Sequence, residues 1–187
     1  MTILYQKIAS RLPTKGQIAP VFSLIIFIAF SWMLYHIFRQ TTSWLYYMGM
    51  LDVMVVYAYA FSFTLVESAS ILLLLLVFCL VSPARFFKDK FVAQGTLQVL
   101  VVSGITYGLR NSIELIPKQD IQTMAAIPGL FLVVMIISIL LFSLILDRLQ
   151  FLSRLLNAIA DRMIIFAYIY VPLGLVGAIV VILRNLF

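Results

Sequence analysis

Long runs of apolar residues, separated by short clusters of charged residues, dominate the pattern along the chain. The runs cover approximately residues 18–38, 56–83, 92–109, 121–146 and 163–183. A helix of about 20 apolar residues crosses a hydrocarbon core about 30 Å thick, and in lipid only a helix or a closed barrel satisfies the backbone polar groups. The pattern therefore predicts an all-α, polytopic transmembrane helical bundle of about five spans, forming a single membrane domain over residues 1–187.

The first run follows a basic segment over residues 1–17, in which Lys7, Arg11 and Lys15 are accompanied by no acid. The run is a full span long, and no small-residue cleavage site follows it. We therefore expect a retained first helix and not a removed signal peptide.

Basic residues between the runs select an orientation. With five spans and a cytoplasmic N-terminus, nine basic residues lie inside and four outside, in the sense of the positive-inside rule. The inner set is Lys7, Arg11, Lys15, Arg85, Lys88, Lys90, Arg148, Arg154 and Arg162, and the outer set is Arg39, Arg110, Lys118 and Arg184. Splitting residues 56–83 at Glu67 would give 6 inside and 7 outside, so we expect one span there.

A four-span arrangement, with residues 92–109 on the cytoplasmic surface, also gives 9 against 4. Charge alone therefore leaves four and five spans open. The 18 uncharged residues from Val92 to Leu109 are enough to cross, although five polar side chains dilute this run. These are Gln94, Thr96, Gln98, Ser103 and Thr106.

Residues 146–163 show the most specific pattern in the chain. Apolar residues recur there at spacings of three and four, which predicts one stripe of an amphipathic helix before the last span. The stripe is Leu149, Leu152, Leu156, Ile159 and Met163, and Arg148, Arg154 and Arg162 lie on other faces. Three arginines suit a cytoplasmic membrane surface, and the stripe equally suits docking on a partner. In the last run, Gly174, Gly177 and Ala178 indicate close helix packing.

Glu67 is the first candidate functional residue, because a carboxylate in hydrocarbon is costly. If the lipid-buried part of its run begins near Ser62, Glu67 lies in the outer third of the membrane, at the depth of His36, Arg39 and Arg110. It then either titrates in a proton- or ion-coupled site or makes an interhelical salt bridge or hydrogen bond. Thr64, Ser68 and Ser70 make its surroundings locally polar.

Arg110 and Glu114 form the second candidate group, at the end of the 92–109 run. Residues four apart share one face of a helix. The pair is either a solvated helix end or a polar rim that contacts a partner or substrate.

Composition narrows the function classes. Hydrophobic residues make up 64% of the chain and charged residues 11%, whereas soluble domains have about 45–50% and about 25%. The net charge of +6 gathers at the ends of the runs, so we expect no nucleic-acid partner. One cysteine, Cys79, and one histidine, His36, provide no internal disulfide, no multi-thiolate metal site and no bis-histidine haem. We expect no catalytic, cofactor-binding or metal-binding residues.

Three functional hypotheses follow. The first is a non-catalytic membrane subunit or scaffold of a larger complex, in contact with the lipid bilayer and with other membrane subunits. The second is a small oligomeric transporter or channel that uses Glu67. The third is a membrane enzyme acting on lipid. The expected location is a bacterial inner membrane or an organellar membrane, with several spans.

Overall fold

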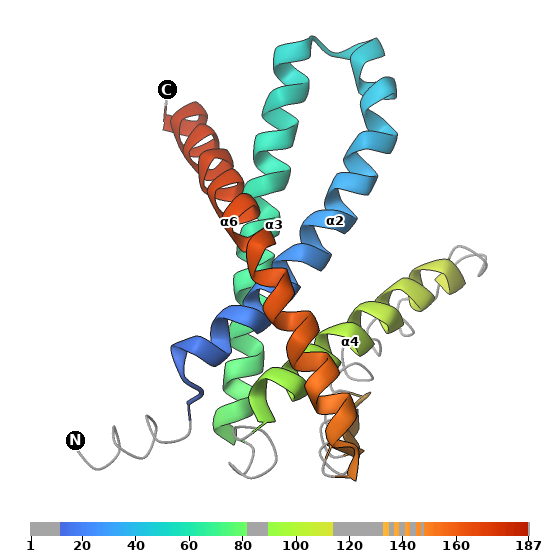
Figure 1. The fold of residues 1–187 in the computed structure, drawn as a ribbon. Coiled ribbons are helices and arrows are strands. Elements are labelled where there is room, and N and C mark those ends of the chain that lie inside the picture. The colour runs from blue at the N-terminus through green and yellow to red at the C-terminus, as the bar shows by residue number, and fades with distance from the viewer. Residues whose placement is uncertain are drawn as a thin grey trace. The chain divides into compact units, whose positions relative to one another are not determined.

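Helices account for nearly all of the described chain. The computed structural model describes residues 12–81, 90–113 and 148–186, together with four residue pairs between 133 and 146; for residues 109–113 only the backbone is described. The helices are α2 (Lys15–Tyr47), α3 (Met50–Val81), α4 (Phe91–Ile113) and α6 (Gln150–Leu186), drawn in Figure 1. Within these ranges there is no strand.

Four of the described helical segments are long and apolar enough to cross a membrane: α2, α3, Phe91–Gly108 of α4, and α6. The predicted all-α membrane bundle is therefore confirmed. The predicted 121–146 span, like Glu114 and most of residues 1–17, lies largely outside the described residues.

The helices are longer than the predicted spans. The sequence places a connection after Phe38, but α2 continues through Arg39 to Tyr47. No glycine or proline occurs between residues 39 and 47 to stop it. The turn comes at Met48 and Gly49, where the Gly49 carbonyl accepts a hydrogen bond from Val53 N at 3.1 Å and α3 starts. Likewise α6 runs unbroken from Gln150, so the predicted amphipathic segment and the last span are joined in one helix.

The chain forms two compact units, which are described separately. The three-helix unit comprises residues 18–77 and 160–187, with most of α2, most of α3 and the C-terminal part of α6. The α4 unit comprises residues 1–17 and 78–159.

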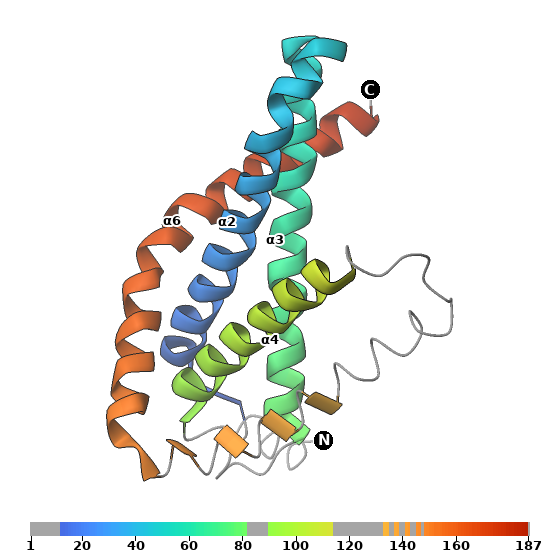
Figure 2. The same ribbon diagram turned by 90° about the vertical axis from the view of Figure 1, so that its right-hand side faces the viewer.

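In the three-helix unit, α2 and α3 form an antiparallel hairpin, and α6 runs parallel to α2. The Phe27 ring contacts Phe166 in a tilted arrangement and Phe30 stacks on Tyr170, with ring centroids 4.5 and 4.9 Å apart. The residue numbers of both pairs therefore rise together along α2 and α6. At the turn end of the unit, the Tyr59 hydroxyl of α3 lies 3.3 Å from Asn185 Oδ1 of α6 and donates a hydrogen bond to it. Figures 1 and 2 show the α2–α3 turn and the end of α6 at the same end of the unit.

The four candidate spans fit a bundle of about four crossings. Whether the chain crosses the membrane four or five times stays a prediction, because most of the predicted 121–146 span lies outside the described residues.

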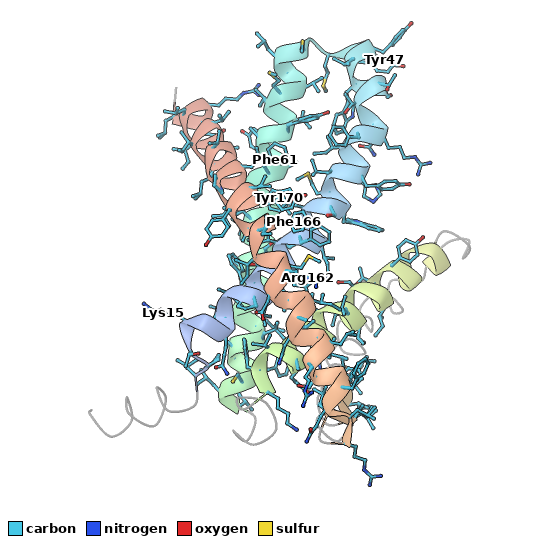
Figure 3. All side chains as sticks on the ribbon, viewed as in Figure 1. Lys15, Tyr47, Phe61, Arg162, Phe166 and Tyr170 are labelled. Carbon is cyan, nitrogen blue, oxygen red and sulfur yellow. The ribbon has the colours of Figure 1, made fainter. Side chains whose placement is uncertain are left out.

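Aromatic rings and close backbone contacts fill the three-helix unit. Phe30 is fully buried and lies between Phe61 of α3 and Tyr170 of α6, at centroid distances of 6.2 and 4.9 Å. Figure 3 labels Phe61, Phe166 and Tyr170 on these helices. A Cβ atom on Gly177 would lie 2.6 Å from the Ala58 carbonyl oxygen, and one on Gly174 would lie 2.8 Å from Leu65 Cβ. The predicted close packing at these glycines is confirmed, because only a missing Cβ lets α6 approach α3 so closely.

The α4 unit has a smaller apolar core. Ala93 and Leu97 of α4 pack with Leu146 and with Leu152 and Leu156 of α6. Two residues of the predicted amphipathic stripe, Leu152 and Leu156, are therefore used inside the unit.

Candidate functional site

Glu67 lies on an outer face of the three-helix unit. Ala58, Ser62 and Leu65 make the contacts of α3 with Gly174 and Gly177 of α6. At about 100° per residue, Glu67 lies nine residues from Ala58 and so points roughly 180° away from α6. Its side chain is exposed, as are Phe63 and Leu74 on the same side of α3.

The register between the helices sets the depth of Glu67. Tyr57 of α3 hydrogen-bonds Thr41 of α2, and Phe61 stacks on Phe30, so Glu67 is level with about residues 24–31 of α2. Leu65 contacts Gly174, so Glu67 is level with about residue 172 of α6. These positions are the middles of the 18–38 and 163–183 runs. Glu67 is therefore level with the middles of these two predicted spans.

The expected position of Glu67 in the outer third of the membrane stays a prediction, but the helix register does not place Glu67 level with Arg39. Arg39 is level with the part of α3 near Tyr57, about ten residues or 15 Å from Glu67 along the helix axis. The expected depth assumes that the lipid-buried segment starts near Ser62. The structure shows that contacts with α2 and α6 fix the position of α3, and that α3 begins at Met50.

The hydroxyl groups near Glu67 are already used by their own helix. Thr64 Oγ1 donates to the Ala60 carbonyl at 2.8 Å, Ser68 Oγ to the Thr64 carbonyl at 2.7 Å, and Ser70 Oγ to the Val66 carbonyl at 2.8 Å. Such back-bonding satisfies a hydroxyl within a helix. The three side chains therefore form no hydrogen-bonding cluster with the Glu67 carboxylate.

The other polar candidates are dispersed. His36 is half-buried and makes edge contacts with Trp32 and Tyr35, at centroid distances of 4.9 and 5.3 Å, while Arg39 is exposed. Arg110 lies on α4, with only its backbone described, and Glu114 lies outside the described residues.

The residues of the 146–163 segment divide between interior and surface. Leu156 is buried, Leu152, Ile159 and Met163 are half-buried, and Leu149 is 53% exposed. The arginines of the segment, Arg148, Arg154 and Arg162, are all exposed.

The N-terminal half of α4 contains buried polar residues that the sequence analysis did not propose as functional. Gln94, Thr96 and Gln98 are fully buried. Ser138 Oγ donates a hydrogen bond to Gln98 Oε1 at 2.9 Å. Gln98 Nε2, Thr96 Oγ1 and Asn157 Oδ1 are buried with no hydrogen-bond partner among the described residues. The dilution of the 92–109 run by polar side chains was the signal that could have identified them.

No protein-family model, curated protein or solved structure matches this chain. Within the described ranges, no three His, Cys, Asp or Glu side chains lie close enough together to hold a metal ion. The arrangement offers two features with chemical meaning: the Glu67 carboxylate on an outer face of the three-helix unit, and the buried polar side chains Gln94, Thr96 and Gln98 of α4.

Proposed function

We propose that this chain is a non-catalytic integral membrane subunit, or scaffold, of a larger membrane protein complex. The observation that carries this proposal is the position of Glu67, near mid-depth on an outer face of the three-helix unit. An acidic side chain at the centre of a single inserted helix costs about 2.5–3.5 kcal/mol on translocon scales. Contact with a partner protein removes that cost, whereas contact with lipid tails does not.

The filled interior of the three-helix unit supports the same proposal. Phe30 and the close contact of Gly177 with Ala58 occupy the region between the helices. A transport pathway needs polar groups that face one another across a space. Here the mid-depth acid instead points away from α6.

The 146–163 segment offers a second surface for the complex. Phe151 and Leu155 are 78% and 46% exposed, and they adjoin the exposed arginines Arg148 and Arg154. Apolar side chains beside arginines suit either the cytoplasmic membrane surface or a partner protein. The arginines can pair with anionic groups there, and the apolar side chains can be buried away from water. We assign this surface to complex formation.

The second candidate function is a small oligomeric transporter or channel, and the buried polar side chains of α4 favour it. Gln98 Nε2 and Thr96 Oγ1 each lack a described partner, and an unsatisfied buried polar group costs about 1–3 kcal/mol. Water or a transported solute would satisfy them.

Purification of the tagged full-length chain in a mild detergent tests the leading proposal. We expect a fixed set of other membrane proteins in constant ratio through affinity and size-exclusion steps. An unrelated tagged polytopic protein purified from the same membranes is the control. Migration of the chain alone, or only with copies of itself, would contradict the subunit function and favour the oligomeric transporter.

A further inference from the structure

The three-helix unit offers Glu67 no cation at its own depth. Its basic residues are Arg39, Arg162 and Arg184. With Glu67 level with about residues 24–31 of α2 and residue 172 of α6, each arginine is about eight residues or more away, which is about 12 Å or more along the axis. The charge of Glu67 is therefore not balanced within its own unit.

The surroundings of Glu67 on α3 are apolar or already satisfied. Phe63 is 77% exposed and Leu74 41% exposed on the same side, and the Ser70 hydroxyl donates to its own helix. The face is thus an apolar helix surface with one carboxylate at its middle.

We propose that this face binds a partner membrane helix that carries an arginine or lysine at the middle of the bilayer. The inference rests on the proposed function as a membrane subunit and names the chemistry of its partner. Two groups of opposite charge attract far more strongly in hydrocarbon than in water. This attraction offsets the free-energy cost of removing each charge from water. The exposed side chains Phe63 and Leu74 would pack against apolar residues on either side of the partner's cation.

Other occupants fit the face less well. A second copy of this chain, docked through the same face, would place two Glu67 carboxylates together, and like charges repel at low dielectric. Lipid headgroup cations lie at the interface, about 15 Å from the bilayer centre. Among these three occupants, a basic side chain on a partner helix is the group that reaches Glu67 at its own level.

A model helix provides a defined probe. We would reconstitute the labelled full-length chain in phosphatidylcholine vesicles with a polyleucine helix of about 21 residues that carries one central arginine. Energy transfer between the two labels reports binding. The matched probe helices carry leucine at the centre, or arginine near one end.

We expect the central-arginine helix to bind about tenfold more tightly than either matched helix. Glu67→Gln should abolish this preference, because it keeps the shape and hydrogen bonding of the side chain but removes the charge. Glu67→Asp should retain most of it, and Ser70→Ala, on the same side of α3, should leave it unchanged. Equal binding of the three probe helices, or a preference that survives Glu67→Gln, would overturn the proposal.

Co-purification separates this inference from the function on which it rests. If partner chains co-purify with the native sequence and are lost from Glu67→Gln, both stand. If they remain fully bound to Glu67→Gln, the proposed charge pairing is contradicted, whereas the proposed subunit function is still supported. If no partner co-purifies at all, the subunit function itself fails. A dimer of this chain that depends on Glu67 would replace the partner helix by a second copy.

Discussion

The two compact units of this chain differ in the hydrogen bonding of their buried polar side chains. In the three-helix unit, hydroxyls such as those of Thr64 and Ser68 bond to their own helix, and the mid-depth carboxylate lies on an outer face. In the α4 unit, Thr96 and Gln98 are fully buried with polar atoms that lack a described partner. Among the described residues, the hydroxyls of Thr64 and Ser68 are therefore satisfied by their own helix, whereas Thr96 Oγ1 and Gln98 Nε2 have no partner.

This difference supports a different one of the two proposed functions in each unit. The exposed Glu67 carboxylate would be neutralised by a partner chain, as expected of a complex subunit. The buried polar atoms of Thr96 and Gln98 would be satisfied by water or a solute, as expected of a transporter. Experiments that alter one unit and its counterpart in the other distinguish these two functions.

The largest expected effect is all-or-none and concerns the direction of α6. In a Cys79→Ala background, Tyr47→Cys and Leu186→Cys should react with a membrane-impermeant maleimide from the same side of the membrane, because both lie at the turn end of the three-helix unit. Arg162→Cys should react from the opposite side. Labelling of Tyr47→Cys and Leu186→Cys from opposite sides would refute the parallel packing of α2 and α6.

The next effect contrasts two glycines. Gly177→Ala should lower the free energy of unfolding by about 1–3 kcal/mol, because the new Cβ would meet the Ala58 carbonyl oxygen at 2.6 Å. Gly104→Ala in α4, where no atom lies within 4 Å, should be neutral or raise stability by up to about 1 kcal/mol through helix propensity. Thermal unfolding in detergent measures both. Similar effects of the two substitutions would mean that α6 does not pack closely on α3.

A pair of threonines compares the interiors directly. Thr96→Val should raise the free energy of unfolding by about 1 kcal/mol, because it removes a buried hydroxyl without a described partner. Thr64→Val should lower it by about 0.5–1 kcal/mol, because it removes a hydrogen bond to the Ala60 carbonyl.

The same unfolding assay measures both threonine variants. A loss of stability in Thr96→Val would show that its hydroxyl has a partner beyond the described residues. Together with reduced solute flux in vesicles, that result would favour the transporter.

The smallest effect concerns the contact between α3 and α6 at the turn end. Tyr59→Phe should cost about 0.6 kcal/mol, typical of an interhelical hydrogen bond in a membrane protein, because it removes the donor to Asn185. Tyr168→Phe, at an exposed position on α6, is the matched control and should change nothing measurable. Equal stability of the two variants would mean that the Tyr59–Asn185 bond contributes nothing.

Much of the fold could be predicted, but little of the candidate site. Apolar run lengths locate α2, α3, α4 and α6, and glycine spacing indicates the close contact at Gly177. The depth of Glu67 could not be predicted, because it depends on which residues of α2 and α6 lie beside it. The hydrogen-bond partners of three hydroxyls near Glu67 could not be predicted either, those of Thr64, Ser68 and Ser70. A hydroxyl that is close to a carboxylate in sequence can instead donate to a carbonyl of its own helix.

The sequence by itself determined that this protein is helical and enters a membrane, because about 20 apolar residues can satisfy their backbone in lipid only by local hydrogen bonding. Only the tertiary structure decided the direction of α6, the outer position of Glu67 and the burial of Thr96 and Gln98. The physical reason is that local hydrogen bonds form each helix independently of the other helices. The direction of a helix, its level beside its neighbours and the side it turns outward depend on side-chain contacts between residues far apart in sequence, such as Phe27 and Phe166.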